Sequence, residues 1–213
     1  IAFSRCFTKQ ASIQKAAAPS NNSRKRFGIP ATASLIVFVG RIHQIKGLDL
    51  LLDAIAKAAD VKPWLLVAGP DEDGSQPGLE AQARSLGIQD RVIFAGIQNG
   101  EDKDAIYACA DMFALTSHTE GLPNAILEAC SHGLPCLVTA PCNIPEVAEQ
   151  GAGLVVDCNV AAIQAALTSM LSDPDSRKSM GAAAKRLIEE KFSLDQVVGK
   201  LSDLYHFLYA SKS

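Results

Sequence analysis

The amino-acid sequence predicts an α/β domain built on a doubly wound, Rossmann-like parallel sheet of about six strands. Two observations support this fold class. Apolar runs of strand length alternate along the chain with segments whose apolar residues recur at helical spacing. The runs are also continuous rather than alternating, which is typical of strands covered by helices on both faces. With 213 residues, 48% of them hydrophobic, the chain has room for one large domain, or for one domain and a tail.

The predicted strands are short apolar runs that each end in a turn or a polar loop. Ligands of doubly wound sheets bind beyond the carboxyl ends of the strands, so we expect the functional residues in the loops that follow these runs. In chain order the runs are Leu35–Val39, Trp64–Ala68, Val92–Ala95, Met112–Thr116, Cys136–Thr139 and Leu154–Val156.

The predicted helices lie between and after the strands. In Gly47–Ala59, apolar residues at positions 48, 51, 52 and 55 form one stripe. The segment Leu79–Leu86 stops at Gly87, a predicted C-cap. Asp173 is expected to cap a helix that begins with Pro174. The remaining predicted helices are Asp102–Ala110, Pro123–Ser131, Val160–Leu171 and a last one capped by Ser193.

The first part of the chain differs from the rest. Residues 1–23 are rich in Ala, Ser, Lys and Gln and show no clear period, so we predict a linker or a loosely docked arm there. Residues 24–213 form the predicted Rossmann-like domain. Because the chain begins with Ile1 rather than Met, we interpret it as processed or as a fragment of something longer.

Composition argues against several classes of protein. The net charge is -3 with both signs mixed along the chain, so no nucleic-acid partner is expected. The longest apolar runs are strand-sized, too short to span a bilayer. The six cysteines form no C-x-x-C pair, and we interpret them as buried free thiols in a reducing compartment. The spacing of Cys130, His132, Cys136 and Cys142 matches no familiar zinc site, so no metal is expected.

The first chemical motif follows the first predicted strand, in the sequence FVGRIHQIKGLDLLL. The short spacing between Arg41 and Lys46 allows one loop to bring both cations to one anion. Arg grips two oxygens in a fork, Lys supplies a compact charge, and a helix N-terminus adds unpaired N–H groups. This combination suits a diphosphate, although a solvated basic loop fits the same residues.

The second motif follows the fourth predicted strand, in TSHTEGLPNAILEACSHG. Glu120 is expected at the carboxyl end of that strand, before the turn Gly121-Leu122-Pro123. Glu128 lies on the next predicted helix, in a polar stripe with Asn124 and His132. A carboxylate accepts two hydrogen bonds from a vicinal diol, so the two carboxylates suit two sugars of one donor. The alternatives are a solvated face for Glu128 and a helix-start acid favoured by the dipole for Glu120.

Other loops carry weaker signals. The third predicted strand ends in Phe94-Ala95-Gly96-Ile97, where Gly96 would let a planar base approach the backbone beside Ile97. An ordinary strand-ending glycine is the alternative. The turn Ala68-Gly69-Pro70-Asp71 suggests no chemistry, and the segment Asn143-Ile144-Pro145-Glu146-Val147 borders the same edge without a readable role.

Together these segments resemble the carboxyl-terminal domain of retaining glycosyltransferases of family 4, which have the GT-B fold. The resemblance rests on GRIHQIKG, on EGLPNAILEA with its E-x7-E pair, and on PEVAEQGAGLVV and DPDSRKSMGAAAKRLIEEKFS. It runs from about Arg24 to Tyr209. The E-x7-E pair alone is a weak signal, but its order and spacing after G-R-x4-K-G make the set specific.

The resemblance implies a hexosyltransferase that takes a sugar from a UDP-, GDP- or ADP-sugar, retains its configuration, and needs no metal or other cofactor. The candidate catalytic residues are Arg41 and Lys46, which would bind the diphosphate and steady the departing nucleotide, and Glu120, which would contact the transferred sugar. Glu128 would hold the ribose, and Ile97 would lie beside the base. Sugar hydroxyls and phosphate would be cradled by the backbone of Gly121, Leu122, Pro123 and Asn124.

Two departures from this family stand out. Many relatives carry a glycine pair where this chain has Pro141-Cys142-Asn143. The amino-terminal domain, which would supply the site for a glycan or lipid-linked acceptor, is missing, and residues 1–23 are too few to replace it. We therefore expect the chain to bind the donor but to be inactive alone. The resemblance also implies a cytoplasmic location, with any peripheral membrane contact made through the missing domain.

Three rival functions remain. A sugar-nucleotide 2-epimerase shares this architecture and also holds a diphosphate, but it is expected to carry further acid–base residues. A dehydrogenase module that binds NAD would carry G-x-G-x-x-G after the first strand, where this chain has GRIHQIKG. A non-enzymatic nucleotide-binding or assembly module with a decayed site fits poorly with intact Arg41, Lys46, Glu120 and Glu128.

Overall fold

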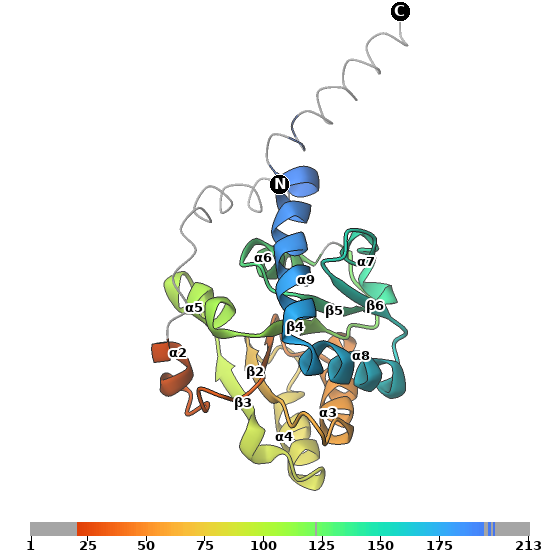
Figure 1. Ribbon diagram of the computed structural model, residues 1–213. Coiled ribbons are helices and arrows are strands. Elements are labelled where there is room, and N and C mark those ends of the chain that lie inside the picture. The colour runs from red at the N-terminus through yellow and green to blue at the C-terminus, as the bar shows by residue number, and fades with distance from the viewer. Residues whose placement is uncertain (1–20, 122, 194–195, 197, 199–213) are drawn as a thin grey trace, which may run out of the picture.

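The computed structural model describes residues 21–121, 123–193, 196 and 198. Six parallel strands in these residues form one sheet in the order β3-β2-β1-β4-β5-β6 (Figure 1). The predicted doubly wound sheet is therefore confirmed, and no predicted strand end differs from the observed one by more than one residue. The strands are β1 (Leu35–Val39), β2 (Trp64–Ala68), β3 (Val92–Gly96), β4 (Met112–Leu115), β5 (Cys136–Thr139) and β6 (Gly153–Val156).

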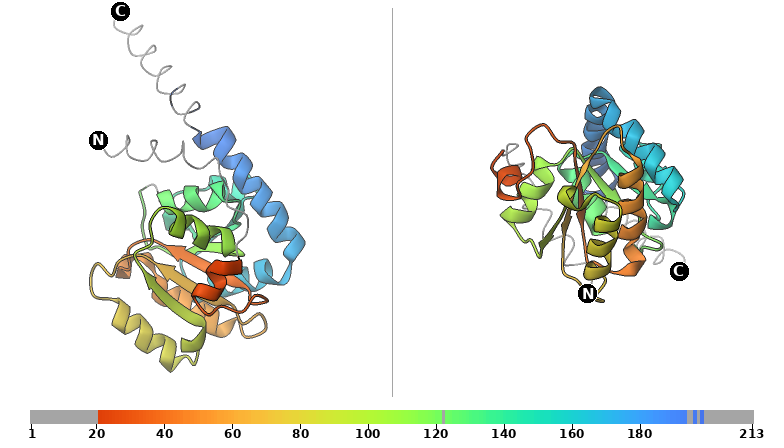
Figure 2. Two further views of the ribbon diagram at one scale, coloured as in Figure 1. Left: turned by 90° about the vertical axis from the view of Figure 1, so that its left-hand side faces the viewer. Right: turned by 90° about the horizontal axis from the view of Figure 1, so that it is seen from below.

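Helices cover both faces of the sheet. They are α2 (Asn21–Arg26), α3 (Leu48–Lys57), α4 (Gln76–Ser85), α5 (Glu101–Cys109), α6 (Asn124–Ser131), α7 (Glu146–Glu149), α8 (Val160–Ser172) and α9 (Pro174–Leu187). Right-handed crossovers place α3 and α4 on one face and α5, α6 and α7 on the other. Helix α8 packs against α3, whereas α9 crosses to the second face and packs against α6 and α7 (Figure 2). Short 3-10 turns at Gln44–Lys46, Gln89–Arg91 and Ala140–Cys142 and a π-helical stretch at Ile188–Phe192 complete the elements.

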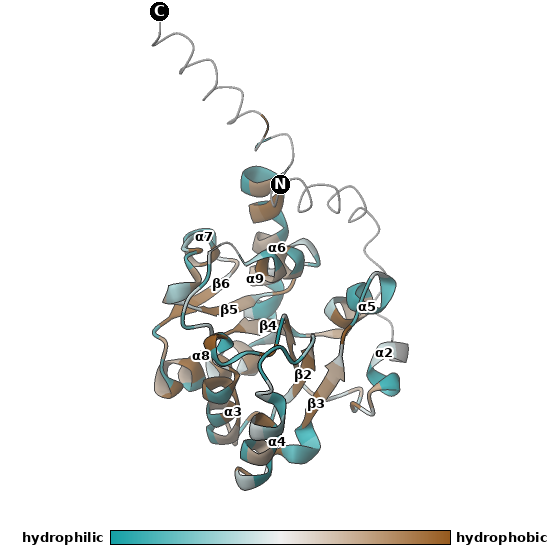
Figure 3. Ribbon diagram, turned by 180° about the vertical axis from the view of Figure 1, so that it is seen from behind, coloured by the Kyte–Doolittle hydropathy of each residue, from teal (hydrophilic) through white to brown (hydrophobic). Residues whose placement is uncertain are grey.

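The core forms along the middle of the sheet. Every residue of β1, β4 and β5 is buried, as continuous apolar runs between two helix layers should be. The edge strands β3 and β6 are mostly half-buried, because each has a neighbouring strand on one side only. Figure 3 shows the strands as mostly hydrophobic, with polar residues gathered on outer helix surfaces and turns.

The helices predicted between the strands are observed, although α4 begins at Gln76, three residues before the predicted Leu79. The predicted stripe of α3, residues 48, 51, 52 and 55, is buried against the sheet. Gly87 follows the end of α4 with a φ of 67°, as a C-cap glycine should. Asp173 caps α9 by accepting a 2.9 Å hydrogen bond from the Ser176 N–H. The helix predicted after Ser193 lies almost wholly outside the described residues.

The segment predicted as a linker or arm is described only at its end. Residues 1–20 lie outside the described residues, and Asn21–Ser23 already belong to α2. In that helix Arg24 donates to the carbonyl oxygens of Cys109 and Ala33 at 2.9 and 2.7 Å and forms an ion pair with Asp111. Helix α2 therefore begins before residue 24.

Two further expectations are tested within the described residues. No helix there is both long and apolar enough to cross a membrane. The interpretation of the cysteines as buried free thiols holds for Cys109, Cys130, Cys136 and Cys142, whereas Cys158 is half-buried. Cys6 lies outside the described residues.

The sheet order sets the place of the site. β1 lies between β2 and β4, and the helices that follow β1 and β4 cover opposite faces of the sheet. The loops that leave the carboxyl ends of β1 and β4 therefore diverge and leave a crevice between them. In doubly wound sheets this switch point is where ligands bind.

Candidate functional site

The loop after β1 forms one tight turn around Lys46. It contains the 3-10 turn Gln44–Lys46, and the Nδ1 of His43 caps this turn by accepting the Ile45 N–H at 3.1 Å. Gly47 ends the turn in the left-handed conformation, with a φ of 62°. A Cβ atom at Gly47 would lie 2.1 Å from the carbonyl oxygen of Thr116, so only glycine fits there.

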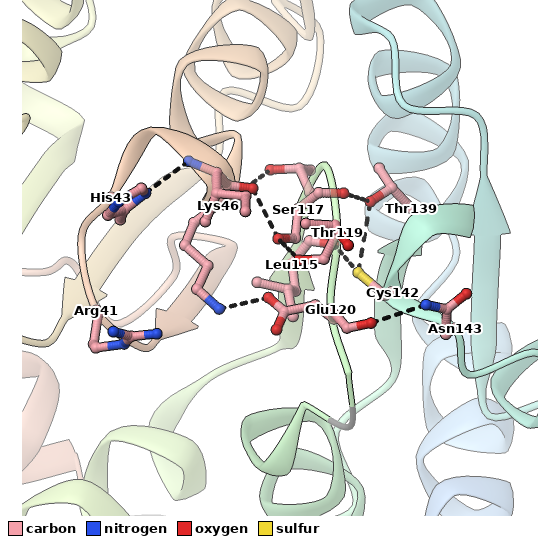
Figure 4. A network of polar contacts seen from close by, with 12 residues as sticks. Arg41, His43, Lys46, Leu115, Ser117, Thr119, Glu120, Thr139, Cys142 and Asn143 are labelled. Atoms are coloured by element: carbon pink, nitrogen blue, oxygen red, sulfur yellow. Dashed lines mark hydrogen bonds and ion pairs between the residues drawn. The ribbon is translucent and has the colours of Figure 1, made fainter.

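The loop after β4 is hydrogen-bonded to this turn. The Thr116 hydroxyl donates to the Gly47 carbonyl oxygen at 2.7 Å, and the Ser117 hydroxyl donates to that of Ile45 at 2.8 Å. Both hydroxyl residues are fully buried. The backbone N–H of His118 donates to the same Ile45 oxygen at 2.8 Å. These bonds hold the two loops of the switch point in one fixed arrangement (Figure 4).

Lys46 and Glu120 meet across the switch point. The Nζ of Lys46 lies 2.6 Å from Oε1 of Glu120, and their side chains are only 14% and 11% exposed. The side chains point toward one another in Figure 4. Lys46 and Glu120 therefore lie at the same edge of the sheet, as predicted. Their direct ion pair was not predicted from the sequence.

The backbone of Glu120 is held by the loop after β5. Its N–H donates to the Pro141 carbonyl oxygen at 3.0 Å, and its own carbonyl oxygen accepts Nδ2 of Asn143 at 2.8 Å. Asn143 adopts a left-handed backbone with a φ of 54°, which Asn tolerates better than most residues. The loop Pro141-Cys142-Asn143 thus supports the Glu120 backbone.

Arg41 has a different partner from Lys46. Its guanidinium forms an ion pair with Glu72, in the loop after β2, and its side chain is 60% exposed. In the same loop Asp73 accepts the N–H of Gln44 and the hydroxyl of Ser75. These bonds, the Ser75 bond foremost, lower the pKa of Asp73.

The sequence suggests no chemistry for the loop after β2, and this expectation is incomplete. Its acidic residues reach the loop that carries both predicted cations. The run Asp71-Glu72-Asp73 directly after a buried strand was the available signal, because the carboxyl ends of parallel strands meet at one edge.

The turn predicted to cradle the donor leads directly into α6. Gly121 is exposed, Pro123 is buried, and Asn124 is the exposed first residue of the helix. Leu122 lies outside the described residues. The N-terminal end of α6 therefore lies at the same edge as Glu120.

Glu128 lies in a polar cluster between α5 and α6, so a freely solvated Glu128 is ruled out. The Nζ of Lys103 contacts Oε1 and Oε2 of Glu128 at 2.7 and 2.6 Å, and the Tyr107 hydroxyl donates to Oε2 at 3.1 Å. His132 stacks on the Tyr107 ring with centroids 5.1 Å apart, and the His132 side chain is only 8% exposed. Burial lowers the pKa of His132 and, together with the Glu128 charge, raises that of Tyr107.

Ile97 stands at the carboxyl end of β3. It is 63% exposed, which is unusual for a large apolar side chain, and it follows Gly96 with its left-handed φ of 64°. Its side chain is therefore open to a ligand or a partner domain.

Within the described residues, no three His, Cys, Asp or Glu side chains are grouped in a way that could hold a metal ion. The sulfur atoms of Cys130, on α6, and Cys136, at the start of β5, lie 3.6 Å apart, and both residues are fully buried. They contribute to the core rather than to the switch point.

Known proteins resemble this chain along most of its length. A family model described as glycosyl transferases group 1 matches residues 19–187. A D-inositol 3-phosphate glycosyltransferase of Corynebacterium kroppenstedtii is 32% identical over 195 residues, which cover 87% of this chain and 43% of that protein. The chain thus spans less than half the length of this curated relative.

Solved structures share the fold. Sucrose-phosphate synthase of Thermosynechococcus elongatus superposes with a TM-score of 0.77 at 24% identity, covering 91% of this chain and 50% of that one. HepE of Anabaena, solved in complex with UDP-glucose, gives a TM-score of 0.74 at 22% identity, covering 88% of this chain and 53% of its own. At these identities the likeness concerns the fold alone.

Proposed function

This chain belongs to the glycosyl transferases group 1 family, and on that premise we propose that it is the donor-binding domain of a hexosyltransferase with two domains of the GT-B type. The proposed substrate is a nucleoside-diphosphate sugar bound at the switch point between β1 and β4. The observation that carries the proposal is the Lys46–Glu120 ion pair, which places a cation and a carboxylate side by side where such a ligand binds.

The diphosphate is proposed to bind Arg41, Lys46 and the N-terminal end of α6. Arg41 is exposed and, among the described residues, pairs with Glu72 on the surface; an ion pair of this type contributes little stability and is easily exchanged. A bound diphosphate would replace Glu72 and Glu120 as the partner of these cations. Positive charge fixed at this place stabilises the negative charge that develops on the leaving nucleotide.

Glu120 is proposed to contact the transferred sugar. When Lys46 turns to the diphosphate, both carboxylate oxygens become available to sugar hydroxyls. The bonds from the Glu120 N–H to the Pro141 carbonyl oxygen and from the Asn143 side chain to the Glu120 carbonyl oxygen hold the Glu120 backbone in position while this exchange takes place. The proposed backbone contacts from Gly121 to Asn124 lie along the same turn.

Glu128 and Ile97 are proposed to bind the nucleoside. The Lys103 and Tyr107 bonds fix the orientation of the Glu128 carboxylate, which suits two hydroxyls of a ribose. The exposed Ile97 side chain offers an apolar surface to a base. HepE, which has the same fold, was solved with UDP-glucose, so the fold accommodates a donor of this class.

The acceptor, the retention of configuration and the independence from metal are part of the same proposal. A second domain would supply the site for a glycan or lipid-linked acceptor, in the cytoplasm or at the cytoplasmic membrane face. Transfer needs the acceptor oxygen at roughly 3–3.5 Å from the reacting carbon in a site closed to water. We therefore propose that the chain alone binds the donor and makes no glycosylated product.

A thermal-shift panel tests the proposal. UDP, GDP, ADP, their sugars and NAD are each added to the chain. Binding to the folded state raises the melting temperature, and at 100 times Kd stabilises by about 2.7 kcal/mol. At least one nucleoside diphosphate and its sugar should stabilise the chain, and NAD should not. Stabilisation by NAD alone would favour a dehydrogenase module, and no shift with any nucleotide would refute donor binding.

A further inference from the structure

A second concave site lies beside the proposed donor site. A pocket of about 770 Å³ opens between the amino-terminal turns of α3 and α4 and the loops after β1, β2 and β4. Its volume falls in the range of about 300–1,000 Å³ that is usual for small-molecule sites. Among the described residues, none of those proposed to bind the donor lines it.

The base of the pocket is apolar. Leu48 of α3 and Leu79 of α4 are buried there, and Ile45 lies partly exposed beside them. These side chains present aliphatic surface to a ligand. Aliphatic surface of this kind packs against the C–H face of a sugar ring, and the exclusion of water from this contact favours binding.

The rim of the pocket is polar and mostly uncharged. It includes His43, Gln44 and His118. Because Nδ1 of His43 accepts the Ile45 N–H, the neutral ring carries its proton on Nε2 and can donate it. Asp49 also lines the pocket, and no ion pair or hydrogen bond of its carboxylate is found among the described residues. The rim therefore offers donors and acceptors suited to hydroxyl groups.

We propose that this pocket is a subsite for a neutral sugar residue of the acceptor glycan at a distance from the reacting hydroxyl, which the second domain would hold. The inference rests on the proposed function for its link to transfer. An apolar base with a rim of imidazole, amide and carboxylate groups matches a hydroxylated ring. The Asp49 carboxylate on its rim disfavours an anion, and no lysine or arginine of the described residues lines the pocket.

The location supports an acceptor rather than an unrelated ligand. His43 and Ile45 lie in the loop between the two donor-binding cations, and His118 is two residues before Glu120. The pocket and the donor site thus share the same two loops, which are held together by the Ser117 and His118 bonds. A glycan seated in the pocket would extend along the sheet edge toward the donor sugar.

Gly78 allows the pocket to be filled without disturbing the fold. It lines the pocket from the first turn of α4, and a Cβ atom added there would meet nothing within 4 Å. Its φ is not in the left-handed region, and replacing a helical glycine generally favours the helix. Gly78→Phe should therefore block the pocket, whereas Ala81→Phe places the same ring on the exposed surface of α4, outside the pocket.

The test measures binding of neutral disaccharides to the full chain by saturation-transfer NMR and titration. Maltose, cellobiose, chitobiose, gentiobiose and α-1,3-mannobiose serve as probes, with inorganic phosphate as the anionic alternative. At least one disaccharide should bind with a Kd of about 1 mM. Gly78→Phe should weaken it at least tenfold and Asp49→Asn several-fold, while Ala81→Phe leaves it unchanged. Saturating UDP should not displace the sugar.

The outcomes separate this inference from the donor proposal. If no disaccharide binds, if Gly78→Phe and Ala81→Phe behave alike although both are folded by circular dichroism, or if phosphate alone binds, the subsite is overturned. If UDP displaces the disaccharide, the sugar occupies the donor site and the subsite is again overturned. If the disaccharide binds as expected but no nucleotide does, the subsite stands and the donor proposal fails.

Discussion

The Nζ of Lys46, after β1, lies 2.6 Å from Oε1 of Glu120, after β4. Each side chain is largely buried, so each charge relies on the other for a partner. A bound diphosphate would take Lys46 away from Glu120, and the same exchange would free Glu120 for the sugar. In the proposed donor site, this pair would link binding of the diphosphate to the release of Glu120 for the sugar.

Glu120→Gln tests that link. Without the carboxylate, Lys46 loses its partner in a mostly buried place, which should lower the free energy of unfolding by about 1–3 kcal/mol. The same change removes a negative charge near the phosphates, so UDP should bind several-fold more tightly and restore stability. Urea unfolding with and without UDP measures both effects. Glu149→Gln, on an exposed carboxylate of α7, is the control and should change neither quantity.

Gly47→Ala should destabilise the chain more than an ordinary left-handed glycine replacement. The left-handed backbone alone costs a non-glycine residue about 1–2 kcal/mol. At Gly47 the new methyl group also meets the Thr116 carbonyl oxygen at 2.1 Å. Gly87→Ala is the matched control, because its φ of 67° is similar and nothing lies within 4 Å of the new Cβ. Equal losses in urea unfolding would contradict the close approach of the two loops.

Glu128→Gln and Lys103→Met test the ribose position. Glu128→Gln should weaken UDP binding by about 1–3 kcal/mol through loss of charged hydrogen bonds. Lys103→Met keeps the Glu128 carboxylate but removes the ammonium group that orients it. The preference for UDP over 2′,3′-dideoxy-UDP should therefore become smaller. Asp102→Asn alters an exposed ion pair on the same helix and should keep the full preference. If wild type binds the two nucleotides alike, Glu128 has no role in holding ribose.

His132 should make stability depend on pH. Its pKa is lowered from 6.5, mainly by burial, so protonation costs more in the folded than in the unfolded chain. The contribution of His132 to stability is full above pH of about 6.5 and is lost as the pH falls through the lower folded-state pKa. His132→Phe keeps a ring against Tyr107 but does not titrate. Between pH 7.5 and 5.5 the wild type should lose more unfolding free energy in urea than this variant, and equal losses would contradict the assignment.

The sheet was predictable because its signals are local. Each strand is a run of consecutive apolar residues, and such a run indicates that both faces of the strand are buried. The positions of Lys46 and Glu120 at the carboxyl ends of β1 and β4 followed from the same pattern. Their ion pair did not, because it depends on Thr116 and Ser117 bonding to the neighbouring loop, which no spacing in the sequence reveals.

The interaction partners of the other candidate site residues also could not be predicted from the sequence. In the sequence, Glu128 resembles a solvated helix residue because its partner Lys103 belongs to another helix. Contacts between two helices produce no periodic pattern in the sequence of either helix. The run Asp71-Glu72-Asp73 after β2 indicates an acidic loop at this edge of the sheet, but nothing in the sequence pairs Glu72 with Arg41. Contacts between residues of distant segments can be identified only once the fold is known. The position of each residue within its own helix or strand can be predicted from the sequence.

The most direct test of the donor site is calorimetric titration of UDP and GDP against uridine and guanosine. One diphosphate should bind more tightly than its nucleoside, and added salt should reduce the difference. Arg41→Ala and Lys46→Ala should each abolish that difference, while Arg84→Ala and Lys57→Ala, on exposed residues of α4 and α3, should preserve it. Equal affinity of wild type for nucleoside and diphosphate would contradict a donor diphosphate site at the β1–β4 switch point.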